Sequence, residues 1–288
     1  MMSVDPVVEL CNKYVAELWE AAMTVKDRVQ HFHTDFSETV EQWKHDLDEM
    51  KEQIREMMKD VADESPLDRD FDFGQVLSTF TWIGILLLAM SIGGVIGNVL
   101  SPLVNCIIGE STALLLALVL LPAFLHSELA KQIKEDDEND IFRRHSLLVF
   151  SFVEGFLIGF AFSARVLVNV PPLAALSAFA IAVPTQMYQD YIDDSRKSLL
   201  GMAIGVGLLA HVLFGFAFGL SASYILLVLV YTVTAFIILQ LHIKHVTRRT
   251  VFTHMYQFAF ICAVMYAQTL IYTIFGTRPE QTADGNSQ

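Results

Sequence analysis

The chain has 288 residues, of which 53% are hydrophobic and 18% are charged, and its formal net charge is −13. A soluble globular domain is rarely this apolar, and the acidic balance excludes a protein that binds nucleic acid through a basic surface. Residues 1–74 hold 19 of the 32 Asp and Glu residues but only 8 of the 19 Lys and Arg residues. Most of the net charge therefore belongs to a polar N-terminal part, and the remainder has the composition of a membrane protein.

The N-terminal part is predicted to be an amphipathic helical extension over residues 1–62. No Gly or Pro lies between Pro6 and Pro66, and apolar residues recur there at steps of three and four. This is the heptad pattern of a coiled coil with one stutter at Phe32–Phe36. The apolar seam consists of Val15, Leu18, Ala22, Val25, Val29, Phe32, Phe36, Val40, Trp43, Leu47, Met50, Ile54, Met57 and Val61.

Two alternatives stay open for this extension. It forms either one continuous helix or a two-helix hairpin, because Asp35 and Glu38 at the stutter have the spacing of a capping box. The seam through residues 15–61 binds either a protein partner or a second copy of the chain, or else it folds back on itself or along the membrane surface. Pro66 and the charged run that follows it predict an acidic linker over residues 63–74, with its charges in solvent.

Residues 75–276 are predicted to form a membrane domain of about seven transmembrane helices, which makes the fold all-α and polytopic. A short disordered tail, residues 277–288, would follow. The hydrophobic runs lie at residues 76–99, 111–125, 146–164, 172–187, 199–220, 224–241 and 254–275. Four glycine pairs have the spacing that lets membrane helices approach closely: Gly93/Gly97, Gly155/Gly159, Gly201/Gly205 and Gly215/Gly219.

The basic residues predict the orientation of these helices. Lys and Arg residues are frequent in the N-terminal part and in alternate loops, whereas the opposite connections contain only Arg165. Positive residues concentrate on the cytosolic side, so the N-terminus is expected there.

No pattern of a catalytic centre is visible, so we expect no enzyme, no cofactor and no metal site. The histidine pairs His31/His33 and His242/His245 are better interpreted as solvated residues at helix surfaces and ends than as metal ligands.

Polar residues within the hydrophobic runs are the better indication of function, because burying them in lipid is costly. Glu154 lies in the middle of a run and is either a neutral buried carboxyl or part of a polar path. His211 and Gln186 are further candidates for such a path. Gln240 and Gln257 are expected to form hydrogen bonds between helices.

From Arg143 onward the chain resembles the Bax inhibitor-1 (TMBIM) family. The similarity lies in the run 143–148 with the following glycine pattern, in Ser195–Ser198 before a glycine-containing helix, in Phe236–His242, and in His254–Gln257. It covers roughly residues 75–275, and residues 1–70 have no counterpart in it.

The resemblance implies a seven-helix protein, mostly of the endoplasmic reticulum, that takes part in calcium leak and in the restraint of cell death. Members of that family usually carry an aspartate at the positions of Gln240 and Gln257, and the two acids form a pH-sensitive latch. Glutamine does not titrate and binds Ca²⁺ poorly, so a Gln240–Gln257 pair would be a permanent clasp with the pH response lost.

Two other functions compete with this one. The chain could be a membrane-anchored interaction protein that recruits a partner through its N-terminal coiled region, or it could be a transporter built around Glu154. The partners expected from the sequence are the lipid bilayer, a protein or a second copy through residues 15–61, and, weakly, a calcium ion.

Overall fold

The computed structural model describes residues 47–67, 71–135, 140–192, 195–245 and 250–278. Most of the predicted apolar seam, including the stutter at Phe32–Phe36, lies outside these ranges, as do most of the predicted tail and His31/His33. The chain divides into two compact units, Met1–Met58 and Lys59–Gln288. The second unit contains all the membrane-length helices found among the described residues and is described first.

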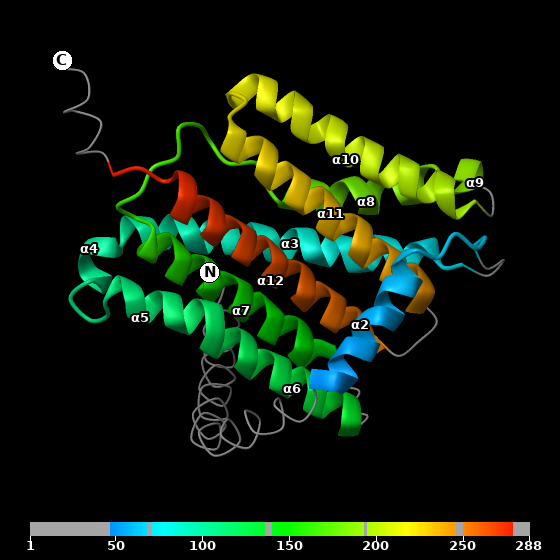
Figure 1. Cartoon of the computed structure of the whole chain (residues 1–288), viewed down its shortest axis with the longest axis horizontal. Coiled ribbons are helices and arrows are strands. Elements are labelled where there is room, and N and C mark those ends of the chain that lie inside the picture. Colours follow the sequence, from blue (N-terminus) through cyan, green and yellow to red (C-terminus); the bar gives the residue numbers. More distant parts are fainter. Residues whose placement is uncertain (1–46, 68–70, 136–139, 193–194, 246–249, 279–288) are drawn as a thin grey trace, which may run out of the picture. The chain divides into compact units, whose positions relative to one another are not determined.

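The regular secondary structure described for the second unit is helical, as Figure 1 shows, apart from one isolated bridge between Val166 and Thr277. Its helices are α3 (Phe73–Val99), α4 (Ser101–Val104), α5 (Glu110–Leu115), the π-helix η1 (Leu116–Leu120), α6 (Leu121–Glu135), α7 (Asp140–Ala161), α8 (Ala175–Met187), α9 (Gln189–Ile192), α10 (Arg196–Phe218), α11 (Ala222–His245) and α12 (Thr250–Phe275). The predicted all-helical class is therefore confirmed.

Six helical segments are long and apolar enough to cross a membrane, which fits a polytopic membrane bundle. They are Phe73–Val99, Glu110–Lys131, Asp140–Ala161, Arg196–Phe218, Ala222–His245 and Phe252–Phe275. The predicted run at 172–187 contains only α8, a 13-residue helix with Pro184 inside it. Such a helix extends about 20 Å, less than the ~30 Å of a hydrocarbon core. The described part of the bundle therefore has six long spans and one short apolar helix.

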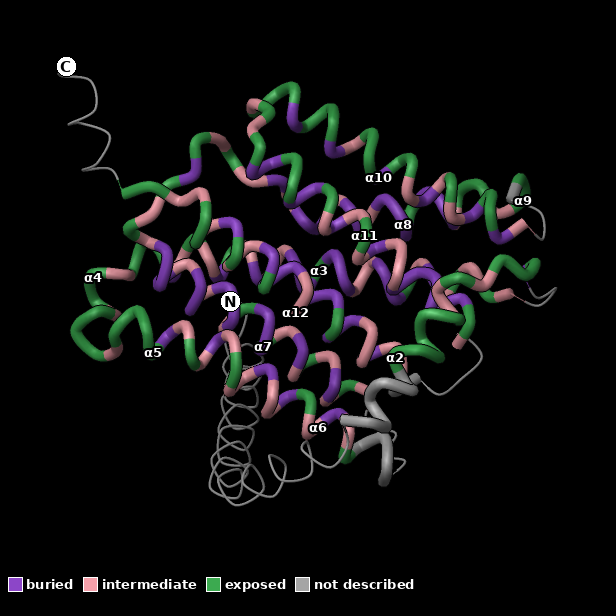
Figure 2. The backbone as a smooth tube through the Cα atoms, in the orientation of Figure 1, coloured by how far each residue is buried: buried purple, intermediate pink, exposed green. Residues whose placement is uncertain are grey.

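Helix α3 is the centre of the second unit. It packs against α7 on one side and α8 on the other, and it also contacts α12 (Figure 1). Helix α10 packs on α8 and α11, and α11 packs on α12. Buried residues follow these shared faces, while the outer turns of α10 are exposed, as Figure 2 shows. Exposed Leu209, Leu213 and Phe216 on α10 are the apolar surface expected of a helix that faces lipid.

Two of the predicted glycine pairs hold α3 and α7 in backbone contact. A Cβ atom added at Gly97 would lie 1.9 Å from the carbonyl oxygen of Phe156, and one at Gly155 would lie 1.9 Å from that of Met90. Glycine is therefore required where the two helices cross. The pair Gly201/Gly205 on α10 differs, because an added Cβ at either position would meet nothing within 4 Å.

Helix α2 (Leu47–Val61) precedes the bundle and spans the boundary between the two units. It covers the last four turns of the predicted extension and ends before Pro66. Three of its apolar side chains are exposed: Ile54 by 45%, Met57 by 41% and Met58 by 66%.

Candidate functional site

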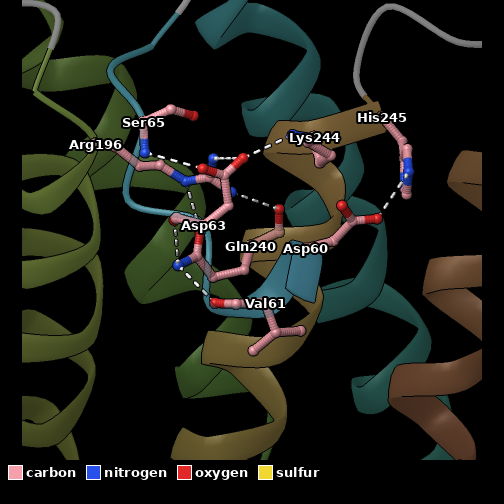
Figure 3. A network of polar contacts seen from close by, with 8 residues as sticks. All are labelled: Asp60, Val61, Asp63, Ser65, Arg196, Gln240, Lys244 and His245. Atoms are coloured by element: carbon pink, nitrogen blue, oxygen red, sulfur yellow. Dashed lines mark hydrogen bonds and ion pairs between the residues drawn. The ribbon is translucent and has the colours of Figure 1, made fainter. Parts of the chain in front are cut away.

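The linker after α2 meets the ends of α10 and α11 in a network of polar contacts, drawn in Figure 3. Ser195 caps α10 by accepting a hydrogen bond from the amide of Ser198, so Arg196 occupies the first position of the helix. Its side chain is only 3% exposed. The N-terminus of a helix already carries positive partial charge, so a buried arginine there needs acceptors and a counter-ion close by.

Gln240, in the last turns of α11, supplies two of those acceptors. The Nε atom of Arg196 donates to the side-chain oxygen of Gln240 at 2.6 Å, and Nη2 donates to its main-chain oxygen at 3.2 Å. The amide nitrogen of Gln240 donates in turn to the carbonyl of Val61 at 3.1 Å and lies 3.5 Å from that of Asp63. A glutamine suits this position because an amide both accepts and donates, which a carboxylate cannot do.

Asp63 is the counter-ion. Its Oδ2 atom lies 3.3 Å from Nη1 of Arg196 and 2.7 Å from Nζ of Lys244, and its Oδ1 atom accepts from the amide of Ser65 at 3.0 Å. The hydrogen bond from Lys244, helped by that from Ser65, holds the pKa of Asp63 well below its ordinary value. We call Asp63, Arg196, Gln240 and Lys244 the linker clasp.

Two further ion pairs flank the linker clasp. Lys197 and Glu64 lie 2.6 Å apart and are both largely exposed, so water screens their attraction. The hydrogen bond from Lys197 lowers the pKa of Glu64. His245 contacts Asp60 at 3.6 Å and forms a hydrogen bond with Tyr256 of α12. The contacts from Asp60 to Ser65 together fasten the linker to α10 and α11.

The expectation that the charged linker is solvated is therefore wrong for Asp63, whose side chain is 19% exposed. The linker clasp joins residues far apart in the sequence, and sequence reasoning did not find it. The sequence contains one indication of it. The acidic linker and the basic residues Arg196, Lys197 and Lys244 are predicted to lie on the same side of the membrane, where opposite charges can pair.

Gln257 belongs to a second polar cluster, at the beginning of α12. Its side-chain oxygen lies 3.0 Å from Nδ1 of His254, and its amide nitrogen donates to the carbonyl of Thr79 on α3 at 3.4 Å. His254 also contacts Asp140 at 2.6 Å, and Asp140 pairs with Arg144 at 2.7 Å. This cluster ties together the first turns of α3, α7 and α12.

The structure does not bring Gln240 and Gln257 together. Both side chains are buried and fully described, and no hydrogen bond joins them. Gln240 bonds to α10 and the linker, whereas Gln257 bonds to α3 and to its own helix.

The three residues predicted to line a polar path come from three helices, α7, α8 and α10, and no hydrogen bond joins them. Glu154 is 0% exposed, and neither of its carboxyl oxygens has a hydrogen-bond partner among the described residues. His211 contacts the hydroxyl of Ser177 at 2.8 Å, and its carbonyl accepts from Tyr224 at 2.6 Å. Gln186 donates to Gln189 at 3.3 Å near the end of α8.

No group of three or more His, Cys, Asp or Glu side chains within the described ranges is placed to hold a metal ion. The contacts described above are those of a structural clasp between a linker and a helix pair. They hold Val61 and the linker residue Asp63 against the ends of α10 and α11.

The sequence matches a protein family described as "Interactor of ZYG-11" over residues 1–278. Searches of curated proteins and of solved structures gave no match. The match includes both the N-terminal extension, which the Bax inhibitor-1 resemblance did not cover, and the whole bundle.

This match overturns the assignment to the Bax inhibitor-1 family. That resemblance was the basis for the roles in calcium homeostasis and in the control of cell death, so these assignments are wrong as well. The resemblance depended on helix order, glycine spacing and hydropathy, which many membrane bundles share because lipid imposes them. The chain belongs to the Interactor of ZYG-11 family.

Proposed function

We propose that this protein is a membrane-anchored interaction protein. The bundle holds it in the bilayer, and the amphipathic arm through residues 15–61 recruits a protein partner on the cytosolic side. The description of the family makes a ZYG-11 protein the first candidate partner. The expectation of an endoplasmic reticulum location came from the overturned resemblance, so the proposal extends only to a membrane location with a cytosolic arm.

The observation that carries the proposal is the exposure of the apolar side chains of α2. Ile54, Met57 and Met58 are 45%, 41% and 66% exposed on a helix that precedes the membrane-length segments. Ile54 and Met57 lie three residues apart and belong to the predicted seam. An amphipathic helix that places apolar residues at this spacing into a groove of its partner is a common mode of recognition.

The linker clasp supports the same function. It fixes the chain immediately after α2 to α10 and α11 through Arg196 and Gln240. A binding arm that is fastened at its base needs less ordering when its partner arrives, and less ordering lowers the entropic cost of binding.

The test uses the full chain in detergent micelles or vesicles and a purified ZYG-11 protein as the probe. The variant Ile54→Ser with Met57→Ser should weaken binding at least tenfold, because two buried apolar contacts are worth more than about 1.4 kcal/mol together. The matched control is Glu56→Gln, an exposed polar change on the same helix that should leave affinity unchanged.

Equal affinity of the wild type and of the double variant would overturn the role of α2. Failure of the wild-type protein to bind the ZYG-11 protein would overturn the choice of partner.

A further inference from the structure

Glu154 is a buried carboxyl that the recruitment function does not use. It lies in the middle of α7, within a membrane-length segment, and is 0% exposed. Both of its oxygens are buried, and neither has a hydrogen-bond partner in the described part of the chain. A lone ionised carboxylate in such a place costs many kcal/mol, so the group takes up a proton instead.

Among the described residues, no Lys, Arg or His side chain is paired with Glu154. Helix α3, which packs against α7, has no ionisable side chain between Phe73 and Val99. On α12, Cys262 and Tyr266 lie within electrostatic range of Glu154. His126 of α6 contacts Phe258, which in turn packs on Phe150 one turn before Glu154.

The hydroxyl of Tyr266, a donor in this neighbourhood, is already committed. It donates to the carbonyl of Leu118 in η1 at 2.7 Å. Pro122, four residues after Leu118, has no N–H group and so cannot give this carbonyl an α-helical hydrogen bond. The hydroxyl proton of Tyr266 is thus used at Leu118 and is not donated to Glu154.

Helix α7 packs closely on α3 directly beside Glu154. The next residue, Gly155, lies against the main chain of Met90 so closely that even a methyl group would not fit. The carboxyl is therefore enclosed by close packing on α3 and by the α12 side chains.

We infer that Glu154 is an intramembrane proton-binding site, which takes up a proton as the bundle packs and releases it when α7 separates from its neighbours. The ligand is a single proton, and the group acts as a folding-linked acid. The inference is independent of the recruitment function, because Glu154 lies in the bundle and not on the arm.

Infrared difference spectroscopy on the full chain in vesicles at pH 7 tests this inference. The spectrum of the wild type minus that of Glu154→Gln should contain the carbonyl band of a protonated carboxylic acid. This band should shift in heavy water and should be replaced by a carboxylate band when the protein is unfolded at the same pH. The control is Glu110→Gln at the exposed start of α5, which should leave the acid band unchanged.

A carboxylate band from Glu154 in the folded protein at pH 7 would overturn the inference. An acid band that persisted after unfolding would also overturn it, because the proton would then not be linked to packing. If Glu154→Gln fails to fold, the wild type is tested by itself, with Glu110→Gln as the reference. The shift of its acid band in heavy water and the loss of that band on unfolding then show whether a buried carboxyl holds a proton that depends on packing.

Discussion

The guanidinium group of Arg196 at the start of α10 and the side-chain amide of Gln240 near the end of α11 form a buried hydrogen bond of 2.6 Å. The same amide donates to the carbonyl of Val61, where α2 ends. One neutral side chain thus connects a buried cation to the main chain of the linker. Its loss removes an acceptor from Nε of Arg196 and a donor from the carbonyl of Val61.

Replacement of Gln240 by leucine, which has a similar volume, should destabilise the bundle by about 2–3 kcal/mol, because a buried charged group loses a hydrogen bond. Thermal unfolding in detergent measures the change. Gln186→Leu is the control, since Gln186 makes one 3.3 Å bond near the end of α8, and it should cost far less. Equal costs for the two variants would contradict the importance given to Gln240.

Asp63→Asn should lower the melting temperature in a pH-dependent way. The pKa of Asp63 in the folded protein lies below its ordinary value of 3.8. Its contribution to stability is therefore complete at neutral pH and disappears as the pH falls below 3.8 toward the folded-state pKa.

The difference in melting temperature between the wild type and Asp63→Asn should thus be largest at pH 7 and shrink in acid. Glu64→Gln is the control, because its pair with Lys197 is exposed to solvent. A difference that stayed constant from pH 7 to the acid limit would show that Asp63 does not act through its charge.

Gly155→Ala should be strongly destabilising, whereas Gly205→Ala should be neutral or slightly stabilising. The added methyl group at position 155 would overlap the carbonyl oxygen of Met90, while at position 205 it would meet nothing within 4 Å. Overpacking costs about 1–3 kcal/mol or more, and alanine favours a helix over glycine by about 1 kcal/mol. The same unfolding assay compares the two, and a similar loss at both sites would disprove the α3–α7 contact.

Tyr266→Phe should cost about 1 kcal/mol, because the carbonyl of Leu118 loses its donor. Pro122→Ala restores an N–H group near that carbonyl, so Tyr266→Phe should cost less in the Pro122→Ala background. A double-mutant cycle measures this coupling. Additive effects would mean that Tyr266 and Pro122 act independently.

The fold was largely predictable because lipid constrains it strongly. Hydrophobic runs of membrane length gave the long helices, and the spacing of Gly93/Gly97 and Gly155/Gly159 predicted a close helix contact that the structure contains. The exception was α8, where the hydrophobic run at 172–187 includes residues that are not helical. Hydropathy indicates only that a segment is apolar enough to lie in lipid. It does not distinguish a full transmembrane helix from a short helix preceded by non-helical residues.

The polar contacts were less predictable. Gln240 and Gln257 were expected to bond between helices, and each forms such a bond, to Arg196 of α10 and to Thr79 of α3. Their partners include the main-chain carbonyls of Val61 and Thr79, which no side-chain pattern marks. Asp63 and Arg196 could be paired only after the ends of α10 and α11 were placed beside the linker. The family was assigned wrongly because the features used for it are shared by unrelated membrane bundles.

The hairpin of α10 and α11 is closed at both ends. At one end the chain turns through Gly219, whose φ of 99° is readily reached only by glycine. At the other end Asp63 bridges Arg196 and Lys244. Asp63 lies between α2 and α3 in the chain, so a force that pulls on the arm would act first on the contacts of Asp63 with Arg196 and Lys244. A partner that pulled on the arm would therefore transmit the force to α10 and α11 before it reached α3.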